Sequence, residues 1–202
     1  MTATLQRKLL LWLPGTLLAS YLLTLIICIQ QSLAASGGSP CGPRLCDVSV
    51  YGAYPPDGPS FTTFRIGFTL MGLQLVFLTW ARLSPTPRGC AFCTMLASSA
   101  MAICCLMLMA YIPYWSSPLH FMFAILTFVF LGIAQGVDAA QAVPPYRCAR
   151  WTILVLTLAS FFGWAVSPFL VGMPISFLEY IATVLPWTYF LTWTIQTAQS
   201  PP

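Results

Sequence analysis

The chain contains six long apolar stretches, and most of its charged residues lie between these stretches or at their ends. Each stretch is close to the ~20 residues that an α-helix needs to cross a hydrocarbon core of ~30 Å. The sequence therefore predicts an all-α membrane protein built as a six-transmembrane-helix bundle. The predicted spans are Leu9–Ile29, Phe64–Ala81, Cys90–Ile112, His120–Val137, Trp151–Val171 and Ile175–Ile195.

Most basic residues fall before the first predicted span and then in every second connection between spans. Three pairs fall on one common side only if all six stretches span: Arg7 and Lys8, Arg82 and Arg88, and Arg147 and Arg150. Because basic segments concentrate in the cytosol, both termini are expected there. At that surface the basic side chains can also meet anionic lipid head groups.

Composition independently indicates a membrane protein. The chain is 58% hydrophobic and 6% charged, whereas about a quarter of the residues in ordinary soluble domains are charged. The net charge of +4 comes mainly from the cytosolic basic residues, so it is not a sign of nucleic-acid binding. No connection is long enough to hold a second domain, and residues 1–202 are interpreted as a single transmembrane domain.

The first apolar stretch has two interpretations. Arg7 and Lys8, the apolar run and then Ser32-Leu33-Ala34 resemble the parts of a secretory signal peptide. The run of about twenty residues is longer than the usual apolar region of ~7–15 residues, which favours an uncleaved signal-anchor helix. Cleavage would leave five helices and an outside N-terminus.

The first outer loop, about Gln30–Thr63, is rich in Pro and Gly, so turns rather than helix are expected there. Cys41 and Cys46 both lie in this loop. An oxidising compartment permits a disulfide, and the short separation favours a local bridge. A bridge to another chain remains an alternative.

Three further cysteines, Cys90, Cys93 and Cys148, are expected on the cytosolic side, next to the membrane. Such cysteines are candidate S-palmitoylation sites, with inert structural thiols as the alternative. A structural zinc ion is bound by four ligands. The one histidine, His120, is expected on the outer side, away from these cysteines, so no metal site is predicted. Standard catalytic motifs are absent, which predicts no catalytic residues and no cofactor.

The other polar residues gather on the predicted outer side. Glu179 lies about one turn inside the sixth stretch, Arg65 enters the second at similar depth, and His120 opens the fourth. A carboxylate at that depth needs a partner, and Arg65 and His120 are the expected ones, with Asp57 in the loop above competing for the same cation. Two interpretations stay open. One is a polar site that binds a lipid head group or moves a proton, and the other is a structural ion pair between helices.

Several segments resemble the Frag1/DRAM/Sfk1 family. The outer loop Gly52–Phe61 is similar to the family signature G-x-x-P-P-E-x-x-x-F, with Asp57 in place of the usual Glu. The stretch led by His120, and Glu179-Tyr180 followed by the aromatic segment Tyr189–Trp193, resemble the fourth and sixth helices of that family. Two positions depart from the pattern, where Phe121 follows the histidine and Gln196 replaces an acidic residue.

The resemblance implies a non-enzymatic membrane protein that modulates autophagy and membrane-lipid homeostasis. Its DRAM-like branch implies a lysosomal, endosomal or plasma-membrane location, and its Frag1 branch implies GPI-anchor lipid remodelling in the Golgi. A small transporter or channel is a further alternative, disfavoured because no predicted span carries mid-membrane charges. The expected partners are membrane lipids and other membrane proteins, not nucleic acid.

Overall fold

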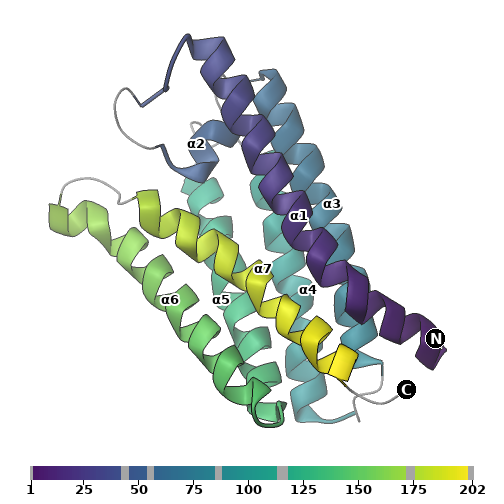
Figure 1. The fold of residues 1–202 in the computed structure, drawn as a ribbon. Coiled ribbons are helices and arrows are strands. Elements are labelled where there is room, and N and C mark those ends of the chain that lie inside the picture. Colours follow the sequence, from purple (N-terminus) through teal and green to yellow (C-terminus); the bar gives the residue numbers. More distant parts are fainter. Residues whose placement is uncertain are drawn as a thin grey trace.

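The computed structural model describes residues 2–41, 46–53, 57–84, 88–112, 118–171 and 176–199. Within these residues the chain forms seven helices and no strand (Figure 1). The helices are α1 (Ala3–Ser36), α2 (Val48–Ala53), α3 (Pro59–Leu83), α4 (Cys90–Tyr111), α5 (Pro118–Gln141), α6 (Tyr146–Val171) and α7 (Ser176–Gln199).

The six long helices form a closed ring. Going round the ring, α1 packs on α3, α3 on α4, α4 on α5, α5 on α6, α6 on α7, and α7 returns to α1. The short helix α2 lies against α1, α3 and α7 at one end of the ring (Figure 1). The start of α1 and the end of α7 lie at the opposite end, which we call the terminal end.

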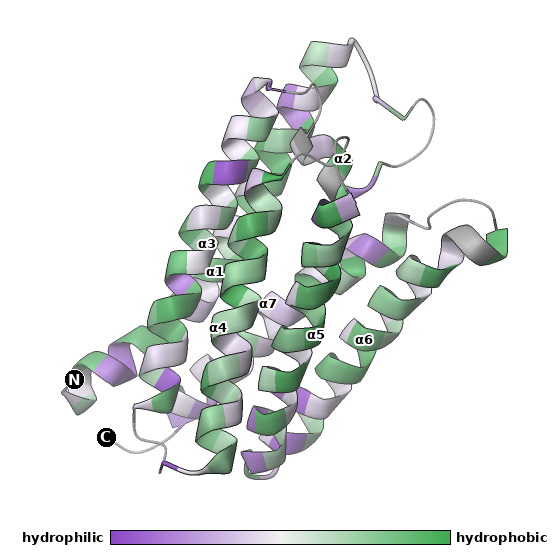
Figure 2. Ribbon diagram, turned by 180° about the vertical axis from the view of Figure 1, so that it is seen from behind, coloured by the Kyte–Doolittle hydropathy of each residue, from purple (hydrophilic) through white to green (hydrophobic). Residues whose placement is uncertain are grey.

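Large apolar side chains cover the outside of the ring as well as its inside. Trp12, Phe162 and Leu170 are each more than two-thirds exposed. In Figure 2 the long helices are coloured as hydrophobic along most of their lengths. Five of them are long and apolar enough to cross a membrane: α1, α3, α4, α5 and the part of α6 up to Ser167. An apolar outer surface of this extent would be unfavourable in water and is favourable in lipid. The chain is therefore an all-helical integral membrane protein.

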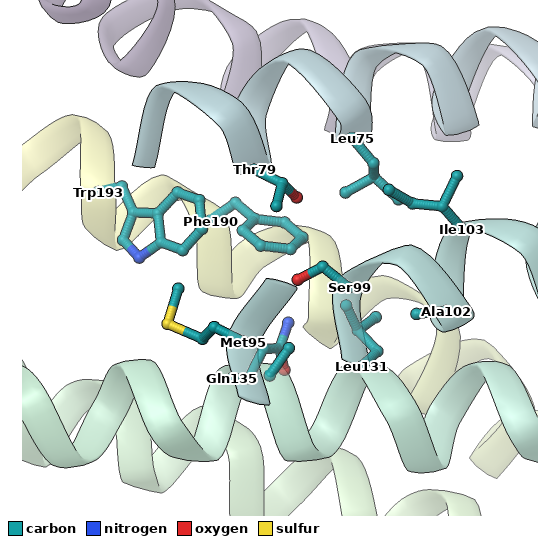
Figure 3. Close-up of a pocket in the computed structure, with 11 residues that line it drawn as sticks. Leu75, Thr79, Met95, Ser99, Ala102, Ile103, Leu131, Gln135, Phe190 and Trp193 are labelled. Carbon is teal, nitrogen blue, oxygen red and sulfur yellow. The ribbon is translucent and has the colours of Figure 1, made fainter. Parts of the chain in front are cut away.

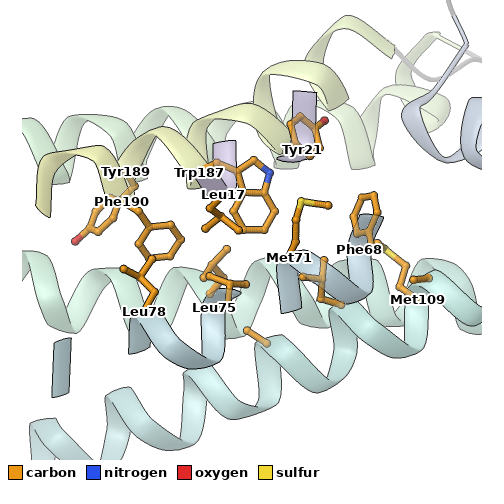
Figure 4. Packing of buried hydrophobic residues seen from close by; sticks show 14 of the residues in the cluster. Leu17, Tyr21, Phe68, Met71, Leu75, Leu78, Met109, Trp187, Tyr189 and Phe190 are labelled. Carbon is orange, nitrogen blue, oxygen red and sulfur yellow. The ribbon is translucent and has the colours of Figure 1, made fainter. Parts of the chain in front are cut away.

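The helix α7 is not among these five, because its sequence is more polar. It carries Glu179 and several Thr residues, and most of its buried positions fall on one face. Aromatic residues of α7 pack in the interior against α1 and α3: Trp187 and Phe190 lie beside Leu17, Met71 and Leu75 (Figure 4).

Five of the six long helices are longer than the apolar stretches that predict them, because a helix continues into its polar flanks, whereas α4 ends at Tyr111, one residue before the predicted end. Thr2 caps α1 by accepting a hydrogen bond from the Leu5 N–H, and Gly37, with a φ of 65°, ends it. The helix α5 begins at Pro118, two residues before the predicted span, and proline suits the first position of a helix. The predicted start of the sixth stretch, Ile175, lies outside the described residues, and Pro14 and Pro186 lie inside α1 and α7.

The expectation that the outer loop lacks helix was wrong. Within Gln30–Thr63, α1 continues to Ser36, α2 forms at Val48–Ala53 and α3 starts at Pro59. Tertiary contacts explain α2, because Val50 and Tyr51 are buried against partly buried Ile29 and Tyr180. Cys41 and Cys46 form a disulfide with each other, so the local bridge is the pairing in this structure.

Candidate functional site

Glu179 lies in the first turn of α7 and is 5% exposed. Its Oε2 atom accepts a hydrogen bond from the backbone N–H of Val48, the first residue of α2, at 2.9 Å. The next residue, Tyr180, donates its hydroxyl to the carbonyl of Cys46 at 3.0 Å. A carboxylate is favourable near a helix N-terminus, and here it meets the N-termini of both α2 and α7. The start of α7 therefore holds α2 over the end of the ring.

The other three residues of the predicted polar site lie at the same end of the ring as Glu179. The Arg65 guanidinium lies 3.8 Å from the centre of the Phe61 ring. His120 is 3% exposed, and its Nδ1 atom lies 2.8 Å from the carbonyl of Ile112. Asp57 is exposed, in the turn before α3, with a φ of 60°. The neighbouring signature residues 54–56 lie outside the described residues.

A cavity of about 50 Å³ lies inside the ring below α2. All seven helices contribute to its walls, which are mostly apolar. Glu179, Thr183 and Tyr21 line it, and the Tyr21 hydroxyl donates to Thr183 Oγ1 at 2.6 Å. A cavity of this size has room for a few water molecules or for one small polar group.

Two indole N–H groups, from tryptophans that line the cavity, lack an acceptor among the described residues. They belong to Trp164 of α6 and Trp187 of α7, which are 7% and 4% exposed. Figure 4 shows Trp187 pointing into the ring beside Tyr21. Buried donors normally find an acceptor, so these groups make the cavity suited to a guest that brings one.

A second polar cluster lies inside the ring near the terminal end, and its centre is Asp138. Oδ1 of Asp138 accepts from Nε and Nη2 of Arg82, both at 2.7 Å. Oδ2 accepts from Arg150 Nη1, the Tyr189 hydroxyl and the Trp193 indole, each at 2.9 Å. Asp138 comes from α5, and its four partners come from α3, α6 and α7.

Arg150 is fully buried, with an exposed fraction of 0%. Besides Asp138 it has two acceptors on α7: its Nε donates to Thr192 Oγ1 at 2.9 Å and its Nη2 to Gln196 Oε1 at 2.6 Å. The guanidinium is therefore bonded through all three of its nitrogens, which is how a buried charge is accommodated. We call Asp138, Arg82, Arg150 and their four α7 partners the Asp138 cluster.

A small void of about 20 Å³ lies next to this cluster. In Figure 3 the side chains of Thr79, Ser99 and Gln135 converge on it from α3, α4 and α5, with Phe190 and Trp193 beside them. It is large enough for one water molecule with polar partners. The void is the size of a hydration site, not of a ligand pocket.

The sequence reasoning missed the Asp138 cluster. The predicted fourth span ended at Val137, one residue before Asp138, and α5 continues to Gln141. Arg150 was expected to set topology at the lipid surface, and it is instead buried in the ring. One available signal was the spacing 189, 192, 193 and 196 of polar and aromatic residues, which puts them on one face of a helix.

The described residues contain no group of three or more His, Cys, Asp or Glu side chains that could hold a metal ion. Cys90, Cys93 and Cys148 are exposed free thiols near the terminal end. Their palmitoylation stays a prediction.

No family model, curated protein or solved structure matches this chain. The fold and its lipid-facing surface define the class, an integral membrane protein with a helical ring. The resemblance to the Frag1/DRAM/Sfk1 family remains an expectation from the sequence.

Proposed function

We propose that this chain is a non-enzymatic, multi-pass membrane protein that binds a membrane lipid at the cavity below α2 and so modulates membrane-lipid homeostasis. The observation that supports this most is the cavity itself, which combines apolar walls with the buried carboxylate of Glu179 and two indole donors that have no acceptor among the described residues. An apolar pocket with a few converging polar groups is the common form of a small-molecule site.

The chemistry of the walls favours a hydroxyl group as the part of the lipid that enters. Glu179 accepts hydrogen bonds, whereas the indoles of Trp164 and Trp187 donate them. A hydroxyl both donates and accepts, so one such group can satisfy a carboxylate and an indole together. The volume of about 50 Å³ suits the hydroxyl of a sterol or diacylglycerol and not a whole lipid.

The proposed protein has six spans, with α7 as the sixth. The helix α7 has 24 residues and packs between α6 and α1 in the ring, and its position between two lipid-facing helices supports a sixth span. Both termini are then cytosolic and α2 lies outside. The proposed locations are the lysosomal or endosomal, Golgi or plasma membrane, with autophagy as the cellular process that the family resemblance implies.

Glu179 variants test the lipid site. We expect Glu179→Gln to lose cross-linking to photoactivatable sterol and diacylglycerol while the protein still folds and reaches its membrane, because the amide no longer accepts as a charged group. Trp187→Phe removes a donor and keeps most of the packing, so it should weaken cross-linking too. Trp12→Phe is the matched control, since Trp12 is 73% exposed.

Membrane abundance and cross-linking are measured together for each variant. If Glu179→Leu keeps normal abundance and full cross-linking, the carboxylate serves neither a lipid site nor the fold, and the proposal is wrong. If Glu179→Gln cross-links normally but has reduced thermal stability, Glu179 only holds α2 in place, and the lipid site is wrong.

The two alternatives have separate tests. A GPI-anchor lipid-remodelling factor predicts altered lipid chains on GPI-anchored proteins after deletion of the gene. A transporter or channel predicts solute or ion flux in liposomes. The charges of the Asp138 cluster are paired with one another, which disfavours the transporter, because ion pathways use charges that can exchange partners.

A further inference from the structure

A groove of about 580 Å³ runs along the outside of the ring between α3 and α4. Its walls include Val76 and Trp80 of α3 and Phe92, Leu96 and Ile103 of α4. Val76, Trp80 and Leu96 are each close to half exposed, so the groove opens sideways toward the surrounding lipid. It is far larger than the cavity below α2 and is separate from it.

The depth of the groove matches one leaflet of a membrane. Its wall on α4 runs from Phe92 to Cys104, two positions twelve residues apart, or about 18 Å at the rise of an α-helix. Half of a hydrocarbon core of ~30 Å is about 15 Å. A lipid chain that starts at the membrane surface near Phe92 would therefore end near Ile103.

Arg88 lines the mouth of this groove, where α3 ends and α4 begins. Its side chain is exposed, and the exposed Ser84 lines the groove beside it. Among the described residues, no carboxylate lines the groove. A guanidinium binds phosphate through two parallel hydrogen bonds, and the uncapped start of α4 after Gly89 adds to the local positive field.

The whole terminal end of the ring is positively charged. It carries six of the eight basic residues of the chain, and its acidic residue, Asp138, is already bonded to Arg82 and Arg150. This end therefore complements an anionic membrane surface, which attracts such side chains.

We propose that the groove between α3 and α4 is a binding site for a single anionic phospholipid of the leaflet at the terminal end. One acyl chain fills the groove along Trp80 and Leu96, and the phosphate of the head group binds the Arg88 guanidinium. The site does not depend on Glu179 or on the cavity below α2.

Native mass spectrometry of the full chain, released from nanodiscs, tests the site. The nanodiscs contain phosphatidylcholine alone or phosphatidylcholine mixed with phosphatidylserine. We expect the wild type to retain one phosphatidylserine and Arg88→Gln to retain about fivefold less, the factor for one basic residue at a membrane surface. Arg147→Gln is the control, because Arg147 is exposed at the same end and does not line the groove.

A second variant tests the acyl-chain part. Ala100 is exposed and lines the groove, so Ala100→Trp fills it without entering the core, and retention of phosphatidylserine should fall while thermal stability stays unchanged. Inorganic phosphate added before release should not displace the lipid, since phosphate alone lacks the chain.

Three results would overturn the proposal. Equal losses for Arg88→Gln and Arg147→Gln would mean diffuse charge attraction without a site. Full retention by Ala100→Trp would mean that no chain occupies the groove. Complete displacement by inorganic phosphate, or equal retention of phosphatidylcholine, would mean that the site does not select an anionic phospholipid.

Discussion

Asp138 makes the densest set of polar contacts described in this chain. One carboxylate accepts from four side chains of three other helices, and two of those side chains are arginines. Burying such a cluster costs solvation free energy, and full hydrogen bonding offsets that cost. Once the cluster is formed, loss of Asp138 leaves the fully buried Arg150 without its counter-ion, so the cluster ties α3, α5, α6 and α7 together.

We predict that Asp138→Ala destabilises the protein strongly, by about 3–5 kcal/mol, because it leaves the fully buried Arg150 without its counter-ion. The measurement is the unfolding of the purified protein in detergent, by heat and by denaturant. Arg147→Gln, three residues before Arg150 on the same helix but exposed, should have an effect near zero.

The double variant Asp138→Leu with Arg150→Leu separates pairing from packing. It should recover part of the stability that Asp138→Leu loses alone, because no unpaired charge is then buried. If the double variant is the sum of the two single losses, the two residues do not interact and the ion pair is not what holds the cluster together.

At the scale of the elements, the pair α1 and α3 packs closely because one position has no side chain. A Cβ atom at Gly67 of α3 would overlap the side chain of Thr24 on α1. Small residues at helix interfaces let backbones approach in lipid, where apolar side chains gain little by leaving the membrane. Gly67 is therefore a packing requirement of the ring.

Gly67→Ala should lower the stability by about 1–3 kcal/mol, the cost of inserting a methyl group into a packed interface. Gly15→Ala on α1 is the matched control, since nothing lies within 4 Å of its Cβ position, and it should be neutral or slightly stabilising. Thermal unfolding in detergent gives both values. Equal effects of the two substitutions would show that helix propensity, and not the contact with Thr24, decides them.

At the scale of the whole molecule, charge is distributed unevenly between the two ends of the ring. The terminal end has six basic residues and Asp138, whereas the end with α2 has, among the described residues, Arg65 and three of the four acidic residues. The ring puts the start of α1 and the end of α7 at the same end (Figure 1). The positive-inside rule then predicts that this end faces the cytosol.

Tags fused to the two termini should accordingly be digested by protease added to the cytosolic face of sealed membranes, while α2 stays protected. Opposite protection of the two tags would mean an odd number of spans or a cleaved first helix. The double variant Arg88→Glu with Arg147→Glu reduces the positive charge of the terminal end, on which the predicted topology depends. It is preferred to a variant of Arg82, because replacing Arg82 would also disturb the Asp138 cluster.

The class of this protein follows from its sequence alone. Long apolar runs must become helices in lipid, since no water is present to satisfy the backbone, and this predicts five of the long helices and the region of α7. The short separation of Cys41 and Cys46 likewise predicted a pairing that the structure contains. These are local properties, which hydropathy and spacing report directly.

Only the tertiary structure decided which polar residues meet. Asp138 lies 56 residues from Arg82 and 51 from Tyr189 in the chain, and they become neighbours because the helices close into a ring. The same closure puts Val48 on Glu179, a partner that no sequence pattern predicted. A hydropathy profile gives the depth of a residue in the membrane but not the direction that its helix face takes, and that direction is set by packing between helices far apart in the sequence.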